Sequence, residues 1–239
     1  MRTTRTTRTT SASRTRRTAF RTGSVALAAA GALALTGCGS SSGSSGNAGS
    51  GADADVAAVS NGTQKAGTLL DTPFTKPALV LTDNHGKPFD LVKQTAGHPT
   101  LIFFGYTHCP DVCPTTMSDL ALAKAKLSQA DQAALRIVFV STDPDRDTPA
   151  RLTQWLGAMD KSFIGLTGKF ETIQNAARSL GIGIDKPVKE KDGSITVTHG
   201  AEVLAFWPKD DKGHVLYMSG TTAEQYAADL PKIIRSEAP

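Results

Sequence analysis

Two cysteines, Cys109 and Cys113, occupy positions where a protein could use them for chemistry. They flank Pro110-Asp111-Val112, and they follow the apolar run Thr100–Phe104, which is typical of a buried strand. The sequence after them is typical of a helix, whose N-terminus carries positive partial charge and free N–H groups that stabilise a thiolate. A thiolate is both a nucleophile and a soft metal ligand. The pair therefore predicts either metal binding or thiol–disulfide exchange at the end of a strand.

The plainer interpretation of the pair is a structural disulfide, because exported proteins favour oxidised cysteines. A bridge between Cys109 and Cys113 would restrict the unfolded chain far less than a long-range bridge would. The spacing of four residues also places two sulfurs on one side of a helical turn. The sequence favours a functional pair, and the structural disulfide stays open as the alternative.

The elements that must position this pair alternate between strands and helices. Strands are expected at 78–82, 89–92, 100–104, 136–140, 163–166, 202–206 and 215–219, and helices at 114–127, 149–159, 170–180 and 222–234. This order predicts the α/β class, as a thioredoxin-like fold with an N-terminal β-hairpin and a terminal hairpin plus helix. The alternative is a flavodoxin-like doubly wound sheet, against which the terminal hairpin argues.

The beginning of the chain predicts a lipoprotein signal. Seven arginines and no acidic residue lie in the first 22 positions, and residues 23–37 are uncharged but shorter than the about 20 residues of a membrane span. Leu35-Thr36-Gly37-Cys38 resembles a bacterial lipobox, so we expect residues 1–37 to be a signal peptide and Cys38 to be lipidated. Residues 38–67 would form a flexible Ser/Gly-rich tether, and 68–239 one folded domain. Arg16-Arg17 leaves the export route open.

This organisation changes the meaning of the net charge of +4. Seven of the 26 basic residues lie in the expected signal, which leaves 19 basic against 22 acidic residues, a net charge of −3, from Cys38 onward. The basic excess is therefore no argument for nucleic-acid binding. We expect a protein held by its lipid at the extracytoplasmic face of the cell membrane.

Four ordered motifs give the chain a family resemblance. They are Gly105–Pro114 (GYTHCPDVCP), Ser141–Pro149 (STDPDRDTP), Gly165–Gly168 (GLTG) and Val197–His199 (VTH). Together they resemble the SCO/SenC family. The resemblance implies a thioredoxin fold and one copper ion per domain, Cu(I) and/or Cu(II), held by Cys109, Cys113 and His199. One departure is Thr198, where the family commonly has Asp.

The resemblance also implies partners. Family members deliver copper to the binuclear site on cytochrome c oxidase subunit II, or keep the cysteines of that site reduced. A copper donor and a thiol reductant are implied as well, without their identities. The residue types agree with this ligand set, because two thiolates suit Cu(I) and an added imidazole accommodates Cu(II).

Other residues near the motifs receive weaker assignments. We expect His85, His98 and His214 to lie away from the site and His108 to face solvent. Asp143, Asp145 and Asp147 are expected to cap a helix and pair with Arg146, because carboxylates are poor ligands for Cu(I). Trp155 and Phe170 are expected in the core, and Asp111 is a candidate for tuning the thiols.

Three functions compete at this stage. A copper chaperone, which binds and transfers metal without being an enzyme, is favoured over a thiol–disulfide oxidoreductase, whose redox pair normally encloses two residues and faces a cis-proline. A peroxiredoxin-like peroxidase fits least, because Thr107 lies two residues before Cys109 where that family has its Thr three before.

Overall fold

A mixed eight-stranded sheet forms the centre of residues 66–239, the part of the chain that this computed structural model describes. Its strands are β1 (Gly67–Thr75), β2 (Val80–Asp83), β3 (Pro88–Asp90), β4 (Thr100–Gly105), β5 (Arg136–Ser141), β6 (Ile164–Thr167), β9 (Val203–Phe206) and β10 (Lys212–Tyr217). They follow one another across the sheet in the order β1-β10-β9-β4-β5-β6-β2-β3. Strands β4, β5 and β6 run parallel, and the other pairs are antiparallel.

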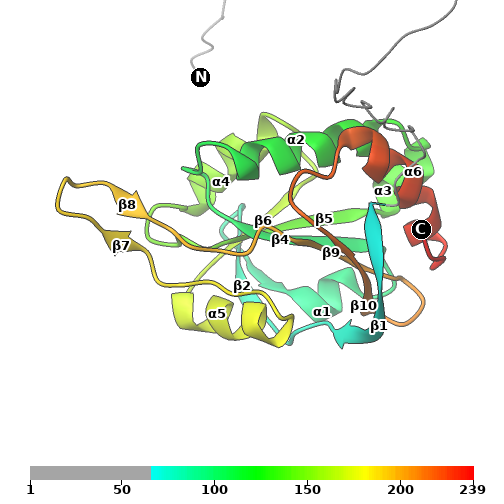
Figure 1. The fold of residues 1–239 in the computed structure, drawn as a ribbon, viewed down its shortest axis with the longest axis horizontal. Coiled ribbons are helices and arrows are strands. Elements are labelled where there is room, and N and C mark those ends of the chain that lie inside the picture. The colour runs from blue at the N-terminus through cyan, green and yellow to red at the C-terminus, as the bar shows by residue number, and fades with distance from the viewer. Residues whose placement is uncertain (1–65) are drawn as a thin grey trace, which may run out of the picture. The chain divides into compact units, whose positions relative to one another are not determined.

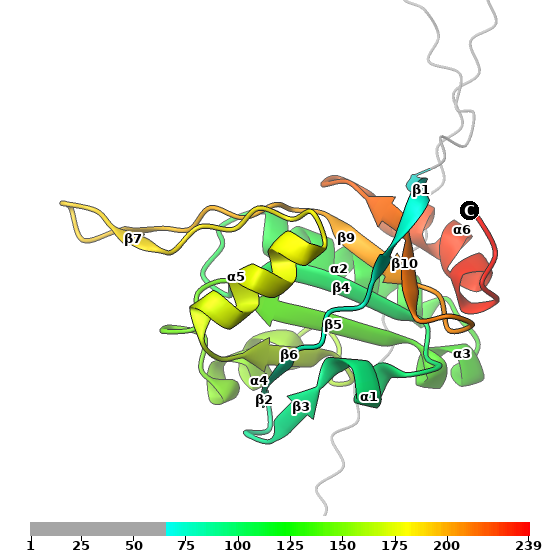
Figure 2. The same cartoon turned by 90° about the horizontal axis from the view of Figure 1, so that it is seen from below.

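Six helices and a separate hairpin complete the described region. The helices are α1 (Leu91–Thr95), α2 (Val112–Ala125), α3 (Gln129–Ala134), α4 (Pro149–Gly157), α5 (Phe170–Ser179) and α6 (Ala223–Ile234). The hairpin consists of β7 (Val188–Lys189) and β8 (Ile195–Thr196), and it projects from the sheet in both views (Figures 1 and 2). The expected signal peptide, Cys38 and most of the tether lie outside the described residues.

Helices cover the sheet on both faces, as Figure 1 shows. Alternate residues of the central strands face opposite sides, so Leu101 and Phe103 join the core under α2, α4 and α6, whereas Ile102 and Phe104 join the core under α1 and α5. Every residue of β4 is buried, which explains its continuous apolar sequence. The sheet therefore fixes the end of β4 firmly, and the cysteine pair follows directly.

Side-chain caps mark the starts of two predicted helices, α4 and α6, whereas the helix expected from residue 114 begins at Val112 without a side-chain cap. The side chain of Thr148 accepts a hydrogen bond from the backbone N–H of Arg151, with Pro149 at the first helical position of α4. Thr222 and Gln225 form a capping box at the start of α6. Gly181 follows α5 with a φ of 73°, the left-handed conformation that glycine adopts easily.

The fold class is confirmed, and five elements, β1, α1, α3, β7 and β8, are additions to the sequence prediction. Strand β1 pairs with β10 through an irregular register between Leu69 and Phe74, so its sequence shows no alternation. The expected strand at 89–92 ends at Asp90, whose side chain accepts a hydrogen bond from the N–H of Lys93 and starts α1. Helix α3 and the β7–β8 hairpin are short and largely exposed. None of the helices between residues 66 and 239 has the length and hydrophobicity that crossing a membrane requires.

Candidate metal site

The loop between β4 and α2 carries both cysteines. The backbone N–H of Cys109 donates to the carbonyl of Tyr106 at 3.2 Å, which closes a tight turn, and Cys113 is the second residue of α2. Cys109 therefore precedes the helix, and this turn, in place of a helical turn, brings the two sulfurs together. A Cβ atom added to Gly105 would lie 2.9 Å from the Cys113 sulfur, so only glycine fits under the thiol at the end of β4.

His199 completes a cluster with the two cysteines. One potential ligand atom from each of the three residues lies within 4.8 Å of the other two. The distance between Cys113 Sγ and His199 Nε2 is 3.6 Å, although the two residues are 86 positions apart. The N–H of Cys113, at the start of α2, donates to Cys109 Sγ at 3.4 Å. The three residues that the sequence and resemblance suggested thus lie together, in an arrangement that could hold a metal ion.

The two thiols differ in their surroundings. Cys113 is completely buried and Cys109 is partly exposed, and neither is in a disulfide. Burial away from water raises the pKa of Cys113 strongly, and the neighbouring Cys109 and Asp147 charges add to the rise. Cys109 Sγ is instead partly open to solvent and accepts the N–H of Cys113 at the start of α2. The exposed thiol is therefore the better nucleophile of the pair.

The orientation of His199 follows from its other ring nitrogen. Nδ1 lies 2.8 Å from the carbonyl oxygen of Gly200, which can only accept, so Nδ1 donates and Nε2 is the ring nitrogen that faces the cysteines. The edge-on rings of Phe103 and Tyr106 enclose the imidazole, at centroid distances of 6.2 Å and 5.6 Å. Burial and the adjacent thiols raise the pKa of Tyr106, so its hydroxyl stays neutral. The imidazole thus lies between two aromatic rings with Nε2 toward the cysteines.

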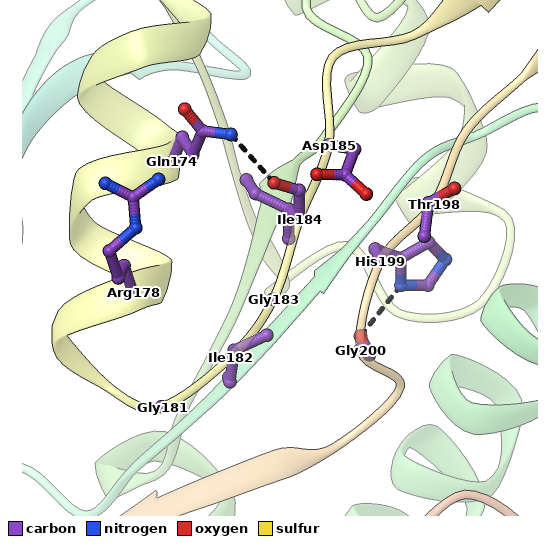
Figure 3. A pocket seen from close by; sticks show the side chains of 10 residues that line it. All are labelled: Gln174, Arg178, Gly181, Ile182, Gly183, Ile184, Asp185, Thr198, His199 and Gly200. Atoms are coloured by element: carbon purple, nitrogen blue, oxygen red, sulfur yellow. Dashed lines mark hydrogen bonds between the residues drawn. The ribbon is translucent and has the colours of Figure 1, made fainter.

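Backbone pairing with the segment around Ile184 also holds His199 in place. Ile184 and His199 are opposite each other in an antiparallel bridge, flanked by hydrogen bonds from Asp185 N–H to the Thr198 carbonyl (3.0 Å) and from Gly200 N–H to the Gly183 carbonyl (2.8 Å). A cavity of about 530 Å³ lies beside this bridge, between it and helix α5 (Figure 3). Thr198 itself is exposed, so no ligand role falls on the position where the sequence departs from the family pattern.

Asp147 holds the cysteine loop in place through hydrogen bonds to Thr107. Its carboxylate is fully buried, and it accepts hydrogen bonds from the Thr107 hydroxyl (2.6 Å), the Thr107 N–H and the Ser141 hydroxyl (2.7 Å). The guanidinium of Arg151 donates to the Thr107 hydroxyl at 2.9 Å. Asp147 therefore ties the loop before Cys109 to the end of β5, whereas the sequence suggested a helix cap or a partner for Arg146.

The remaining candidates lie where the sequence placed them in most cases. Asp143 pairs with Arg146 as expected, Asp145 is exposed, and neither joins the metal cluster in the described region. The other histidines lie apart from the cluster: His85 is exposed, His98 lies 3.1 Å from the Ala134 carbonyl, and His214 lies 2.9 Å from Asp210. His108 is exposed, and its Nδ1 lies 3.7 Å from the Asp147 carboxylate. Trp155 and Phe170 pack in the two cores. Asp111 is exposed and precedes α2 without a side-chain capping bond.

The donor set determines which metal fits. Two sulfurs and one imidazole nitrogen are soft or borderline ligands, and such a set selects Cu(I) over hard ions such as magnesium. The buried ring of Phe103 and the half-buried ring of Tyr106 lie against the imidazole at this site. A low-coordinate soft cation is the ion that this arrangement accommodates best.

Comparison with known proteins decides the family. The sequence model of the SCO1/SenC family matches residues 67–235. The chain belongs to the SCO1/SenC family. The yeast mitochondrial protein SCO1 is 34% identical over 157 residues, which is 64% of this chain and 52% of the yeast protein, so this chain spans about half the length of that relative.

Solved structures of other family members share the fold. The copper-bound ScoI of Bradyrhizobium japonicum has 35% identity and a TM-score of 0.58, and the match covers 68% of this chain and 98% of that one. The apo Sco1 protein of Thermus thermophilus has 32% identity and a TM-score of 0.62, over 72% of this chain and 98% of that one. These likenesses confirm the thioredoxin-like fold and the family resemblance.

Some residues of the site carry no assignment from the sequence. Tyr106 lies within the first motif, three residues before Cys109, so its proximity to the pair was visible but its contact with His199 was not. Ile184 carried no signal, because its pairing with His199 depends on how the chain folds back over residues 183–200. Thr107 and Asp147 both lie in the quoted motifs, and only the structure joins them.

Proposed function

We propose that this chain is a copper metallochaperone of cytochrome c oxidase assembly. It binds one copper ion, as Cu(I) and/or Cu(II), through Cys109, Cys113 and His199, and delivers it to the binuclear site on subunit II. The observation that carries the proposal is the cluster of three ligand atoms within 4.8 Å of one another in a SCO1/SenC domain. A family member with 35% identity has been solved with copper bound, which supports the choice of metal.

The site suits transfer as well as binding. Cys109 is partly exposed, so an incoming thiolate of the acceptor can reach the metal from that side while Cys113 and His199 still hold it. Exchange of ligands one at a time avoids a free ion, and it needs no change in oxidation state when Cu(I) is moved. We place this exchange at the extracytoplasmic face of the cell membrane, with the Cys38 lipid as anchor.

The ligand set can be tested by substitution. Cys109→Ser and Cys113→Ser should each weaken copper binding by orders of magnitude, because a hydroxyl is a harder and less acidic ligand than a thiol. His199→Ala should weaken Cu(II) most, since imidazole suits that ion better than sulfur alone. His85→Ala, His98→Ala and His214→Ala serve as controls. If His199→Ala bound Cu(II) like the wild type and His108→Ala did not, the imidazole would be misassigned.

A thiol–disulfide oxidoreductase is the second candidate, favoured by the unequal thiols. The Cys109 thiolate would attack a target disulfide, forming a mixed disulfide and releasing one target thiolate. Cys113 would then lose its proton and attack the Cys109 sulfur, which releases the second target thiol and leaves Cys109 and Cys113 as a disulfide. A separate thiol reductant must restore the pair. This activity would keep the cysteines of the oxidase site reduced.

The redox state of the pair separates the two functions. A disulfide removes both thiolates, so the oxidised chain should lose nearly all copper affinity in a competition assay, and equal binding by both forms would refute the ligand assignment. The reduced chain is then mixed with an oxidised peptide that carries the oxidase copper ligands. Fast catalytic reduction without copper transfer would favour the oxidoreductase over the chaperone.

A further inference from the structure

His199 lies on a different part of the molecule from the two cysteines. Residues 183–200 form a two-stranded ribbon, paired at Gly183–Gly200 and Asp185–Thr198 near the base and at Val188–Thr196 and Lys189–Ile195 farther out. The outer part of the ribbon projects from the sheet in Figures 1 and 2. The cysteines instead sit on the loop between β4 and α2. The position of the ribbon base therefore determines how close His199 lies to Cys113.

The imidazole has few anchors of its own. Its Nδ1 bonds to Gly200, the next residue of the same ribbon, and its Nε2 faces Cys113. The rings of Phe103 and Tyr106 limit sideways movement but form no hydrogen bond with it. Within residues 66–239, the ring thus depends on its backbone partner, the segment around Ile184, for its place.

Gln174 fastens that segment to the body of the domain. It lies on α5 between Ile173 and the buried Ala176–Ala177 pair, so the helix cannot shift easily. Its side-chain Nε2 donates to the carbonyl of Ile184 at 2.9 Å (Figure 3). A continuous path therefore runs from α5 through Gln174 and Ile184 to His199 and the metal cluster.

The ribbon base meets α5 through a cavity, buried side chains and the Gln174 hydrogen bond. About 530 Å³ of open space separates parts of the segment from α5, and a Cβ added to Gly183 would meet no atom within 4 Å. Arg178 and Asp185 line the same cavity, and both are exposed (Figure 3). The side chains of Ile182 and Ile184 are buried in the same core as α5, so packing holds the side chains of the segment, and the Gln174 hydrogen bond adds a direct hold on its backbone at the Ile184 carbonyl.

We propose that Gln174 is a positioning residue for His199, which latches the ribbon base to α5 and so sets the strength of the third metal ligand. The inference rests on the proposed function and deepens it. Gln174 touches no metal ligand directly. Loss of its donor lets the backbone at Ile184 shift while its side chain stays in the core, which moves the imidazole relative to Cys113 and weakens Cu(II), which depends on nitrogen, more than Cu(I).

The test uses variants of the full chain that change the donor and keep an unbranched side chain. Gln174→Met keeps an unbranched side chain of similar length and removes the donor, whereas Gln174→Lys restores an N–H donor. Gln132→Met is the matched control, because Gln132 Nε2 donates to the Leu127 carbonyl at the same 2.9 Å, on α3 and outside the site. Gln174→Met should weaken Cu(II) about three- to tenfold, Gln174→Lys should recover most of it, and the control should match the wild type.

A second readout needs no copper. The ring signals of His199 in the NMR spectrum of the reduced, metal-free chain should shift or broaden in Gln174→Met and not in Gln132→Met. Unchanged His199 signals in Gln174→Met would overturn the latch, as would equal losses of Cu(II) affinity in both variants. Shifted signals in a chain whose wild type binds no copper would uphold the latch and reject the proposed function, so the two failures are distinguishable.

Discussion

The two thiols of one short loop are chemically unequal. Cys113 is enclosed by the core and its pKa is strongly raised, while Cys109 is partly exposed and accepts a helix N–H. A thiolate reacts and a buried thiol does not, so the pair combines one accessible nucleophile with one protected partner. This asymmetry serves both proposed functions, because the same exposed sulfur would meet an acceptor's thiolate or a target disulfide first.

The asymmetry predicts the order of alkylation. In the reduced, metal-free chain, iodoacetamide should modify Cys109 at least about tenfold faster than Cys113, because burial keeps Cys113 protonated and inaccessible. Mass spectrometry of the peptides after timed quenching measures both rates. Unfolding in urea is the control, since it should bring the two rates close together. Faster labelling of Cys113 in the folded chain would contradict the assignment.

The raised pKa of Cys113 also predicts how copper binding depends on pH. The metal-free chain holds the Cys113 proton through the neutral range, and copper must displace it to bind the sulfur. Binding therefore releases at least one proton, and affinity should rise about tenfold per pH unit between roughly pH 6 and 8 for each proton released. Competition titrations at several pH values measure the slope. A flat profile would mean that Cys113 binds no metal.

Among the elements, the cysteine loop depends on a buried carboxylate. Asp147→Ala would leave the Thr107 N–H and the Ser141 hydroxyl without their acceptor inside the protein. We expect the free energy of unfolding to fall by about 3 kcal/mol, because buried donors that lose a charged acceptor are costly. Asp145→Ala is the control from the same motif; since Asp145 is exposed, its effect should stay within about 0.5 kcal/mol.

Urea unfolding measures both variants. Asp147→Asn adds a useful intermediate, because the amide keeps one acceptor oxygen but loses the charge, and its stability should fall between wild type and Asp147→Ala. Equal stability of Asp147→Ala and Asp145→Ala would show that the contacts to Thr107 and Ser141 contribute nothing.

Buried, regular elements could be predicted from the sequence, whereas exposed or irregular ones could not. Strand β4 and the caps of α4 and α6 were predictable, because continuous apolar runs and capping residues are local signals. Strand β1 and the β7–β8 ribbon were not, since their pairing is irregular or exposed and leaves no periodic trace. The proximity of the two cysteines was anticipated, but through a helical turn, whereas the turn from Tyr106 to Cys109 produces it.

The residues of the site also divide into those that the sequence reveals and those that only the folded chain brings together. Cys109 and Cys113 were visible from their types and spacing alone. His199 entered through the family resemblance, because no local pattern distinguishes it from the other four histidines. Gln174 and Ile184 were invisible in the sequence, since their contact arises only when the ribbon folds back against α5.

At the scale of the whole described region, the strand register aligns distant parts of the chain in one row across the sheet, near the carboxyl end of β4. Gly67, the first residue of β1, is opposite Tyr217, which is opposite Val203, which in turn is opposite Phe103 near the end of β4. The N–H of Gly67 also donates to the buried carboxylate of Asp229 at 3.3 Å. Strand β1 thus begins at the end of the sheet from which the cysteine loop leaves β4, and two contacts fix it there.

The proposed lipid anchor at Cys38 can be tested separately from the metal site. Cys38→Ala should leave a protein that is unprocessed or released from the membrane, because the acyl chains that would hold it, at about 0.8 kcal/mol per buried methylene, have no other attachment point. Membrane fractionation and the mass of the N-terminal peptide measure this. Copper affinity should be unchanged, since the ligand cluster of the described region lies wholly between residues 109 and 199. Wild-type chain recovered in the soluble fraction with an unmodified N-terminus would refute the anchor, and a loss of copper binding in Cys38→Ala would mean that the N-terminal cysteine takes part in the site.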